Sequence, residues 1–376
     1  MKIIAKYNDK ETDISFPCSE AHLSKKIKEL TGSEDYPANM FVKEFVEPTQ
    51  FNSLKDTFLN LDELNYLAKR MDSFNGQEED TFFAAMENEN INNTIGLINL
   101  TFNLPRYTLI QELKDMEKVG RQHMMNTSVV TADNSEGRDY AKIGRELLAS
   151  GKGCFTNHGL LFKNEEVPNN IVYLGQVFPQ YSYKDSYLLC VQVSYCELSE
   201  YLYLPEEDNA ITKAFNRLGA SPDECAYSVE EFNMNDPKWE KRFSDLFETD
   251  GIFDINALAE NIHDNDIDLN KLEALIHFVD DHAAETMAKL AQREDSFRFL
   301  AGVASDYDLG QHLIDNYPEY EVPTEVYDFV DFDKFGEHMH DEFEGEYVDE
   351  GYVYIPDGRT LEAVMRKPLF MNMGGM

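Results

Sequence analysis

Two stretches with the same pattern decide the fold of this chain: KIIAKYNDKETDISFP at residues 2–17 and CVQVSYCELSEYLYLP at residues 190–205. In each, apolar and polar residues alternate on both sides of a short polar turn, which is the pattern of two antiparallel strands in a hairpin. Each stretch ends in an apolar residue and then proline, which cannot continue a strand ladder because it lacks an N–H group. The sequence therefore predicts that the same hairpin opens two units, 188 residues apart.

The similarity continues down the chain. Segments that match in residue type, in the same order, are Leu30-Thr31-Gly32 with Arg217-Leu218-Gly219, Glu44-Phe45 with Glu231-Phe232, Leu64-Asn65-Tyr66-Leu67-Ala68 with Ile255-Asn256-Ala257-Leu258-Ala259, Gly120-Arg121-Gln122-His123 with Gly310-Gln311-His312, Asp139-Tyr140-Ala141-Lys142-Ile143-Gly144 with Asp331-Phe332-Asp333-Lys334-Phe335-Gly336, and Gly159-Leu160-Leu161-Phe162 with Gly351-Tyr352-Val353-Tyr354. An offset that varies only between 187 and 192 residues is hard to obtain by chance. We therefore expect a tandem duplication of one unit.

The duplication predicts four segments: unit 1 at 1–165, a connector at 166–186, unit 2 at 187–358 and a tail at 359–376. Tyrosine, valine and proline in the connector favour an extended, packed segment over a flexible linker rich in glycine and serine. The end of the tail, after Lys367, is rich in methionine and glycine, and we expect it to fray.

Each unit has the same predicted order of elements. The opening hairpin is followed by a helix, with apolar residues at Leu23, Ile27 and Leu30 in one unit and at Ile211, Phe215 and Leu218 in the other. Two or three helices come next, and apolar stripes mark one of them in each unit, at Leu61, Leu64, Leu67, Ala68 and Met71 and at Ile255, Leu258, Ala259 and Ile262. A helix and a hairpin close each unit, at 139–150 and 153–163 in unit 1 and at 331–343 and 346–355 in unit 2. This order predicts the α+β class rather than alternating β-α-β units.

The charge of the chain is strongly negative and unevenly distributed. It has 71 acidic and 33 basic residues in 376, a net charge of −38, with 42% hydrophobic residues that are enough to form cores. Residues 1–165 hold 26 acidic and 19 basic residues, whereas residues 166–376 hold 45 and 14. The excess charge therefore belongs to unit 2. Such a protein repels nucleic acid and anionic lipid and attracts basic surfaces.

The apolar runs and the cysteines of the sequence bear on compartment and membrane association. No apolar run approaches the 18 residues of a membrane-spanning helix, and the N-terminus lacks the apolar stretch of a signal peptide. The five cysteines form no CxxC pair, which is typical of reduced thiols. We expect a cytoplasmic protein that does not bind membranes.

The acidic clusters of unit 2 are the candidate binding site. Each one alone is what a solvated face looks like, but residues 166–376, which contain all of them, carry a net charge of −31, which is the phosphate charge of roughly 15 base pairs of duplex DNA. We interpret them as carboxylates that take the place of phosphates. The candidates are Glu206, Glu207, Asp208, Asp223, Glu224, Glu230, Glu231, Asp264, Asp266, Asp268, Asp280, Asp281, Asp306, Asp308, Glu319, Glu321, Asp341, Glu342, Glu344 and Glu346.

Each unit resembles the ArdA family of antirestriction proteins, which conjugative plasmids and transposons carry. The resemblance lies in the opening KYNDKETDISFP and in the closing DYAKIGRELLASGKGCFTNHGLLF, with DFDKFGEHMHDEFEGEYVDEGYVYI as its less faithful copy in unit 2. It implies an elongated chain of small α+β subdomains that mimics bent B-form DNA. Such proteins block type I restriction–modification enzymes by occupying their DNA-binding site, and most have one unit and pair as dimers.

This chain departs from the family in three ways. Two units are fused, Ser15 and Tyr203 stand where the family has tryptophan, and unit 1 is barely acidic. Two arrangements remain open: the fused units reproduce the family dimer within one chain, or an acidic mimic is joined to a unit that binds something else. Whether two chains form a homodimer also remains open.

The expected function is stoichiometric inhibition of a type I restriction–modification enzyme, with no catalysis, no cofactor, no metal and no binding of nucleic acid. The alternative is an interaction protein of the same fold that inhibits another basic DNA-binding or defence protein. A third hypothesis is a metal-dependent hydrolase that uses acidic clusters as ligands.

Motifs of catalysis are absent from the sequence. HExxH, GxSxG and the P-loop do not occur, and Gly151-Lys152-Gly153 is read as a helix end before a hairpin. The stretch from Asp264 to Asp268 starts like a calcium loop, but leucines stand at its required glycine and glutamate, so a helix N-cap is the better interpretation. Two groups are candidate metal ligands on one helix face, His277 with Asp281 and His282, and His338 with Asp341 and Glu342; solvated histidines are the alternative.

Overall fold

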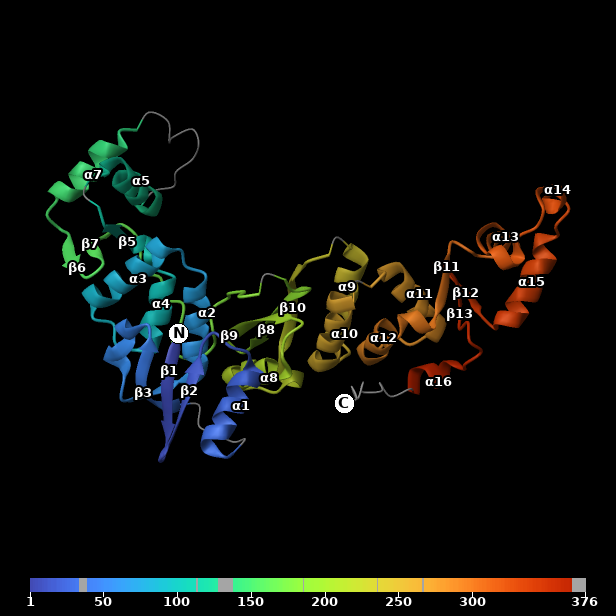
Figure 1. The fold of residues 1–376 in the computed structure, drawn as a ribbon, viewed down its shortest axis with the longest axis horizontal. Helices are drawn as coiled ribbons and strands as arrows, with labels where there is room; N and C mark the ends of the chain where they lie inside the picture. The colour runs from blue at the N-terminus through green and yellow to red at the C-terminus, as the bar shows by residue number, and fades with distance from the viewer. Residues whose placement is uncertain are drawn as a thin grey trace, which may run out of the picture. The chain divides into compact units, whose positions relative to one another are not determined.

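A computed structural model of the chain shows helices and small antiparallel sheets, which confirms the α+β class (Figure 1). It describes residues 1–33, 39–112, 114–127, 138–184, 186–234, 236–265 and 267–366. By packing, the chain forms two compact units: the first is Met1–Asp185, Ser194–Tyr201 and Asn209–Ala220, and the second is Ser186–Val193, Leu202–Asp208 and Ser221–Met376.

A four-stranded antiparallel sheet opens the first unit, in the order β2-β1-β3-β4. Its strands are β1 (Lys2–Tyr7), β2 (Lys10–Ser15), β3 (Asn39–Glu47) and β4 (Thr57–Asn60). The alternation in β1 buries Ile3 and Ala5 on one face. Helix α1 (Glu20–Thr31) buries Leu23, Ile27 and Leu30, as its apolar spacing predicts.

The second predicted hairpin forms as well, and its sheet has the order β10-β8-β9. Its elements are β8 (Leu189–Tyr195), β9 (Leu198–Leu204), α8 (Asp208–Leu218) and β10 (Ala226–Phe232). Helix α8 buries Ile211, Phe215 and Leu218, which confirms the predicted stripe. The hairpin tip and most of α8 belong by packing to the first unit, so the compact units do not follow the predicted repeat boundaries residue by residue.

Helices follow each opening sheet. In the first unit they are α2 (Leu61–Asp72), α3 (Gly76–Glu89) and α4 (Thr94–Thr101), and in the second α9 (Pro237–Leu246), α10 (Ile252–Asn265), α11 (Leu269–Val279) and α12 (Ala284–Gln292). The second unit thus has four helices here, more than the two or three expected. The additional helix is α9, which forms because Asp236 caps it, Pro237 fits its first turn, and Trp239, Phe243 and Leu246 share its buried face.

Each closing segment has a three-stranded sheet and a pair of helices. These are β5 (Tyr107–Ile110), α5 (Met116–Thr127), α7 (Tyr140–Ala149), β6 (Cys154–Thr156) and β7 (Gly159–Lys163), and then β11 (Arg298–Ala301), α13 (Asp306–Asn316), α15 (Phe332–Phe343), β12 (Glu346–Val348) and β13 (Gly351–Tyr354). The strand orders β5-β7-β6 and β11-β13-β12 correspond. The predicted closing hairpins form, and the predicted closing helices are α7 and α15.

Repeated glycines explain how the closing helices pack. A Cβ atom at Gly120 on α5 would collide with the carbonyl oxygen of Tyr140 on α7, and one at Gly310 on α13 would collide with that of Phe332 on α15. Gly144 and Gly336 lie equally close to the backbone of the partner helix. Only glycine allows each helix pair to approach this closely.

Shorter elements and the connector complete the chain. The short elements are η1 (Thr49–Leu54), η2 (Leu104–Arg106), η3 (Pro222–Glu224), η4 (Glu294–Ser296), η5 (Pro318–Tyr320), α14 (Thr324–Tyr327) and α16 (Leu361–Arg366). The connector has no helix or strand in its described residues, and Tyr173, Phe178 and Tyr181 pack into the first core, so the prediction of a packed connector is confirmed. The tail end that we expected to fray, residues 367–376, lies outside the described residues.

In the described residues the two halves share the order hairpin, helix, strand, helices, strand, helix pair and hairpin, with β4 added in the first half and α9 and α14 in the second. The origin of this order in a duplicated sequence stays a prediction. In the described ranges, none of the helices is both long and apolar enough to cross a membrane.

Candidate acidic interface

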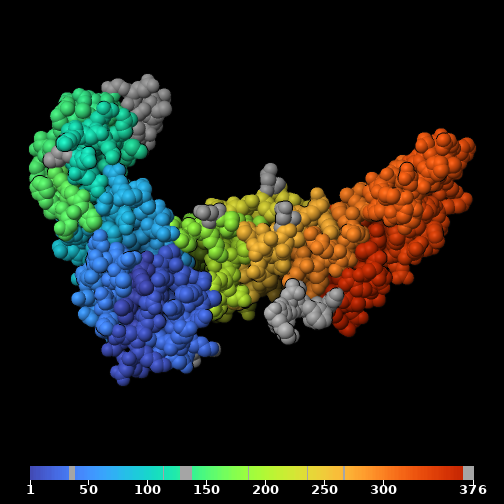
Figure 2. Space-filling model, in the orientation of Figure 1, coloured from blue at the N-terminus to red at the C-terminus, as the bar shows by residue number. Residues whose placement is uncertain are grey.

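The predicted carboxylates all belong to the second unit, most of which is the yellow-green to red part of the surface in Figure 2. Four of them are partly buried: Glu206, Glu207, Asp306 and Asp308. Asp266 lies outside the described residues. The others are exposed. Exposure alone does not make a binding surface, because an exposed carboxylate can still be held by a neighbouring donor of the same chain.

Several of these carboxylates stabilise local structure. Asp268 caps α11 by accepting the N–H groups of Asn270 and Lys271, which confirms the helix N-cap. The acidic first turn that the sequence also suggested is wrong, because the first turn of α11 holds no acidic residue and Asp264 lies at the end of α10. Asp281 accepts the N–H of Ala283 and the hydroxyl of Thr286, and the backbone bond is the main reason why the pKa of Asp281 is lowered. These carboxylates have structural partners already.

Others are engaged in the same way. Each of the following accepts a hydrogen bond or lies beside a histidine: Glu206 with the N–H of Glu207, Glu224 with Ser221, Glu231 with the Tyr187 hydroxyl, Asp264 with His263, Asp306 with Tyr347 and His340, Asp308 with Ser305, and Glu342 with His338. Glu207 and Asp208 also make contacts. Sequence clustering could not separate these roles, because capping and surface carboxylates are the same residue types.

The remaining candidates have no such partner. Within the described residues, no hydrogen bond or ion pair engages the side chains of Asp223, Glu230, Asp280, Glu319, Glu321, Asp341, Glu344 and Glu346. Several lysines and arginines of the same unit pair with other carboxylates, as in Lys271 with Glu294, Lys289 with Glu285 and Lys334 with Asp331. These eight residues therefore present negative charge that the chain itself does not neutralise; we call them the unpaired carboxylates.

Helix α15 carries an acidic row that the search for clusters missed. Asp333, Glu337 and Asp341 are exposed and four residues apart, so they share one helix face at intervals of about 6 Å along its axis. The equivalent positions on α7 are Ala141, Arg145 and Ala149, at the offset of 192 that the two closing segments share. The spacing of four residues between these carboxylates in the sequence could have identified the row. The same helix face is thus acidic in one half only.

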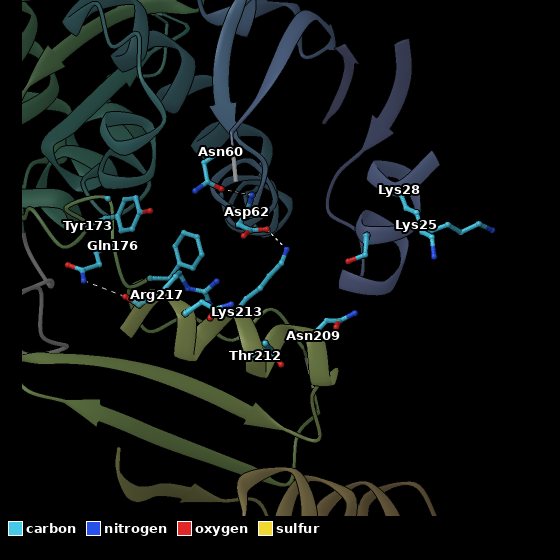
Figure 3. A pocket seen from close by; sticks show the side chains of 14 residues that line it. Lys25, Lys28, Asn60, Asp62, Tyr173, Gln176, Asn209, Thr212, Lys213 and Arg217 are labelled. Atoms are coloured by element: carbon cyan, nitrogen blue, oxygen red, sulfur yellow. Dashed lines mark hydrogen bonds and ion pairs between the residues drawn. The ribbon is translucent and has the colours of Figure 1, made fainter. Parts of the chain in front are cut away.

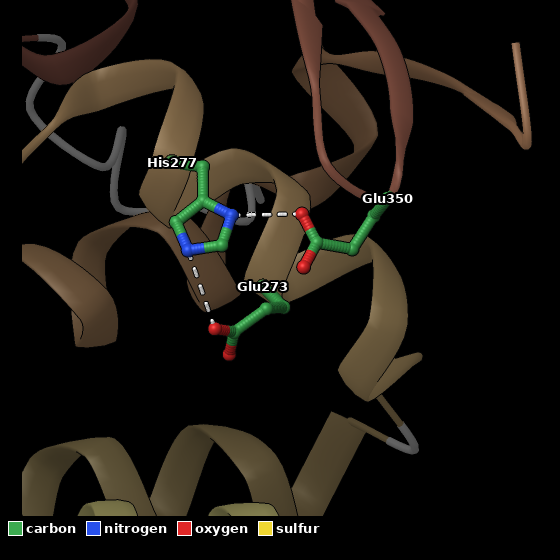
Figure 4. A group of neighbouring side chains, drawn as sticks. All are labelled: Glu273, His277 and Glu350. Carbon is green, nitrogen blue, oxygen red and sulfur yellow. Dashed lines mark hydrogen bonds and ion pairs between the residues drawn. The ribbon is translucent and has the colours of Figure 1, made fainter. Parts of the chain in front are cut away.

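One predicted metal-ligand group is wrong. Helix α11 ends at Val279, and Asp280 has the left-handed backbone of a C-cap, so Asp281 and His282 do not share a helix face with His277. The structure instead places His277 between two glutamates, as Figure 4 shows. Its Nδ1 lies 2.8 Å from a carboxylate oxygen of Glu350, and its Nε2 lies 3.5 Å from one of Glu273.

These three side chains have the chemistry of a metal site, because their ligand atoms lie within 4.8 Å of one another. Two cations already contact the same carboxylates, however. Lys238 lies 3.1 Å from Glu273 and 3.5 Å from Glu350, and Arg242 contacts Glu273 as well. A divalent ion would have to overcome both positive charges. The arrangement fits a buried ion-pair network that joins α9, α11 and the β12–β13 turn.

The other predicted metal-ligand group is a solvated pair. His338 lies 3.8 Å from Glu342 one turn along α15, and both side chains are well exposed. The group brings no third ligand into reach among the described residues.

A comparison of the sequence with models of known protein families found no match, and no curated protein matches it.

Proposed function

We propose that this protein is a stoichiometric inhibitor whose second unit enters the DNA-binding groove of a type I restriction–modification enzyme and competes there with DNA. The resemblance to the ArdA family suggests the target. The observation that supports the mode of binding is the set of unpaired carboxylates. Catalysis and cofactors have no part in the proposal.

The charge argument starts from the cost of these residues. Like charges on one surface repel each other and lower the stability of the folded state. That cost falls when the surface meets lysine and arginine side chains that otherwise neutralise phosphates, and bound counterions leave both partners. A DNA-binding groove supplies such side chains in excess. The acidic surface therefore has a lower free energy in a basic groove than when it is exposed to water.

The acidic row on α15 supports the same mode. The carboxylates of this row lie about 6 Å apart along a rigid helix axis, which is roughly twice the ~3.4 Å axial spacing of the phosphates on one DNA strand. The row thus presents a line of charge with about half the density of one strand. A rigid scaffold matters because it holds the charges in place before binding, so little entropy is lost on association.

The test is a charge-reversal variant of the unpaired carboxylates. Asp223, Glu230, Glu319, Glu321 and Asp341 are each replaced by lysine. The helix cap Asp268 and the hydrogen-bonded Asp281 are kept so that folding is not affected. The matched control reverses the same number of exposed carboxylates in the first unit: Asp9, Glu44, Glu47, Glu79 and Glu112. Cleavage and methylation by a purified type I enzyme are measured with increasing inhibitor.

We expect the second-unit variant to lose inhibition by at least about 100-fold, which corresponds to about 2.7 kcal/mol, while the control retains most of it. Equal loss in both variants would mean that only net charge matters, which contradicts a specific surface on the second unit. Absence of inhibition by the unmodified protein against several type I enzymes, together with capture of another basic DNA-binding protein, would point to the alternative target.

A further inference from the structure

The first unit contains a cavity of about 1030 Å³ whose lining is basic and polar, in contrast to the charge of the chain. Its walls are α1, the start of α2, part of the connector and α8, all within that unit (Figure 3). Four cations line it: Lys25, Lys28, Lys213 and Arg217. Asp62 is the only carboxylate among the fourteen lining residues.

The cavity lies between equivalent faces of two helices. The buried stripes of α1 and α8 correspond at an offset of 188, since Leu23, Ile27 and Leu30 match Ile211, Phe215 and Leu218. The lining residues correspond at the same offset: Ser24 with Thr212, Lys25 with Lys213, and Lys28 with Asn216. Equivalent polar residues of the two helices therefore line one space from both sides.

The carboxylates near the cavity are paired with Lys213 and Arg217, two of the four cations that line it. Lys213 lies 2.6 Å from Glu20 and 2.5 Å from Asp62. Burial lowers the pKa of Lys213, but these two carboxylates outweigh that effect and raise it. The Nε–H of Arg217 is shared between the two carboxylate oxygens of Glu200, at 2.9 and 3.0 Å, and its Nη2 also donates to Glu200. The guanidinium lies over the ring of Phe178.

The outer donors have no such partner. Lys25, Asn209 and Asn216 are exposed, and within the described residues no hydrogen bond or ion pair engages their side chains. A ligand in the cavity thus meets ammonium and amide donors, while the one carboxylate of the lining, Asp62, is held by Lys213. This combination favours a ligand that is anionic and rich in acceptors.

We propose that this cavity binds a phosphate-bearing small molecule, with Lys25 and the amides of Asn209 and Asn216 as donors to its phosphate oxygens. Lysine is a common phosphate ligand because its compact charge can point three donors at one anion. The volume is in the range of sites that hold small molecules the size of a nucleotide. The site is separate from the acidic interface and does not depend on the proposed inhibition.

The experiment measures binding to the full chain by calorimetry, with inorganic phosphate, pyrophosphate and ATP as separate probes. We expect saturable binding of one pyrophosphate or ATP per chain, with a Kd of about 1 mM or lower and a rise in Tm that grows with ligand concentration. Equal affinity for pyrophosphate and ATP would show recognition of the phosphates alone. Tighter binding of ATP would show that the nucleoside also contributes.

Two variants test the location. Lys25→Glu reverses the free cation, and Asn216→Asp replaces a donor by an anion of the same shape. Each is expected to weaken binding at least about tenfold. Lys55→Glu and Asn270→Asp make the same chemical changes at exposed positions outside the cavity and should leave the affinity unchanged. Failure of all three probes to bind, or binding that both cavity variants leave intact, would overturn the proposal.

Discussion

Two buried asparagines form the same pair of side-chain-to-backbone hydrogen bonds in the two halves of the chain. Asn65 on α2 accepts the N–H and donates to the carbonyl of Cys18, each at 3.0 Å. Asn256 on α10 does the same to Glu206, at 2.9 and 2.8 Å. The sequence aligns these two residues, but their role depends on a chain segment roughly fifty residues away, which no local pattern indicates.

Replacing Asn256 by alanine should therefore destabilise the second unit. The backbone N–H and carbonyl of Glu206 would lose the hydrogen bonds to the buried Asn256 side chain. We expect the free energy of unfolding to fall by about 1–3 kcal/mol. Denaturant unfolding measures the change. Asn265→Ala, on the exposed end of the same helix, is the control and should change the free energy of unfolding by less than about 0.5 kcal/mol. Similar losses in both variants would contradict the role of Asn256.

Asp281 links stability to pH. Its hydrogen bond from the N–H of Ala283, and that from Thr286, lower its pKa in the folded state. A group with a lowered folded pKa contributes stability above its unfolded pKa of about 4 and loses that contribution as pH falls through the lower value. Asp281→Ala removes the acceptor of these two hydrogen bonds and should cost about 1 kcal/mol at pH 7 and progressively less below pH 4. A cost that is the same at pH 7 and pH 3, measured by urea unfolding, would contradict this linkage. Glu230→Ala is the control, because no hydrogen bond engages that carboxylate among the described residues.

At the scale of elements, the sequence predicts what local periodicity determines. Both hairpins and the buried stripes of α1 and α8 follow from alternation and helical spacing alone. The end of α11 was not predictable in the same way, because Leu272, Leu275 and Ile276 continue an apolar pattern that only the left-handed Asp280 stops. Helix α9 was missed because no equivalent segment in the first unit guided the assignment.

The crossing of α13 and α15 gives a prediction for this scale. Gly310→Ala would place a methyl group against the backbone of α15, and overpacking of this kind costs about 1–3 kcal/mol or more. Gly76→Ala is the matched control, since a Cβ there meets no atom within 4 Å. Thermal unfolding should show a clearly lower Tm for Gly310→Ala and little change for Gly76→Ala. Equal Tm values would mean that the helices separate without cost.

At the scale of the whole molecule, the sequence places the negative charge in one half. It does not show which carboxylates are hydrogen-bonded within the chain and which have no partner. Asp281 and Asp223 look alike in a cluster search, yet one holds a helix start and the other has no partner among the described residues. That distinction needs the positions of backbone N–H groups. The row on α15 was accessible to sequence analysis through its period of four, because helical spacing alone places Asp333, Glu337 and Asp341 on one face.

Electrostatic competition predicts a dependence on salt. Raising the salt from about 50 to about 200 mM should weaken inhibition at least about tenfold, because exposed charges are screened and less is gained from counterion release. Inhibition that stays constant over this range would point to an apolar interface instead. The measurement is the concentration that halves methylation, with enzyme activity at each salt concentration as the control.

The most direct measurement is displacement of a labelled DNA duplex from a type I restriction–modification enzyme, followed by fluorescence anisotropy as the protein is added. Competition for one groove predicts that DNA is released completely, at close to one protein per DNA-binding site, and that excess DNA reverses the effect. A complex that retains DNA while the protein is bound, or no release at any ratio, would contradict competition for the DNA-binding groove.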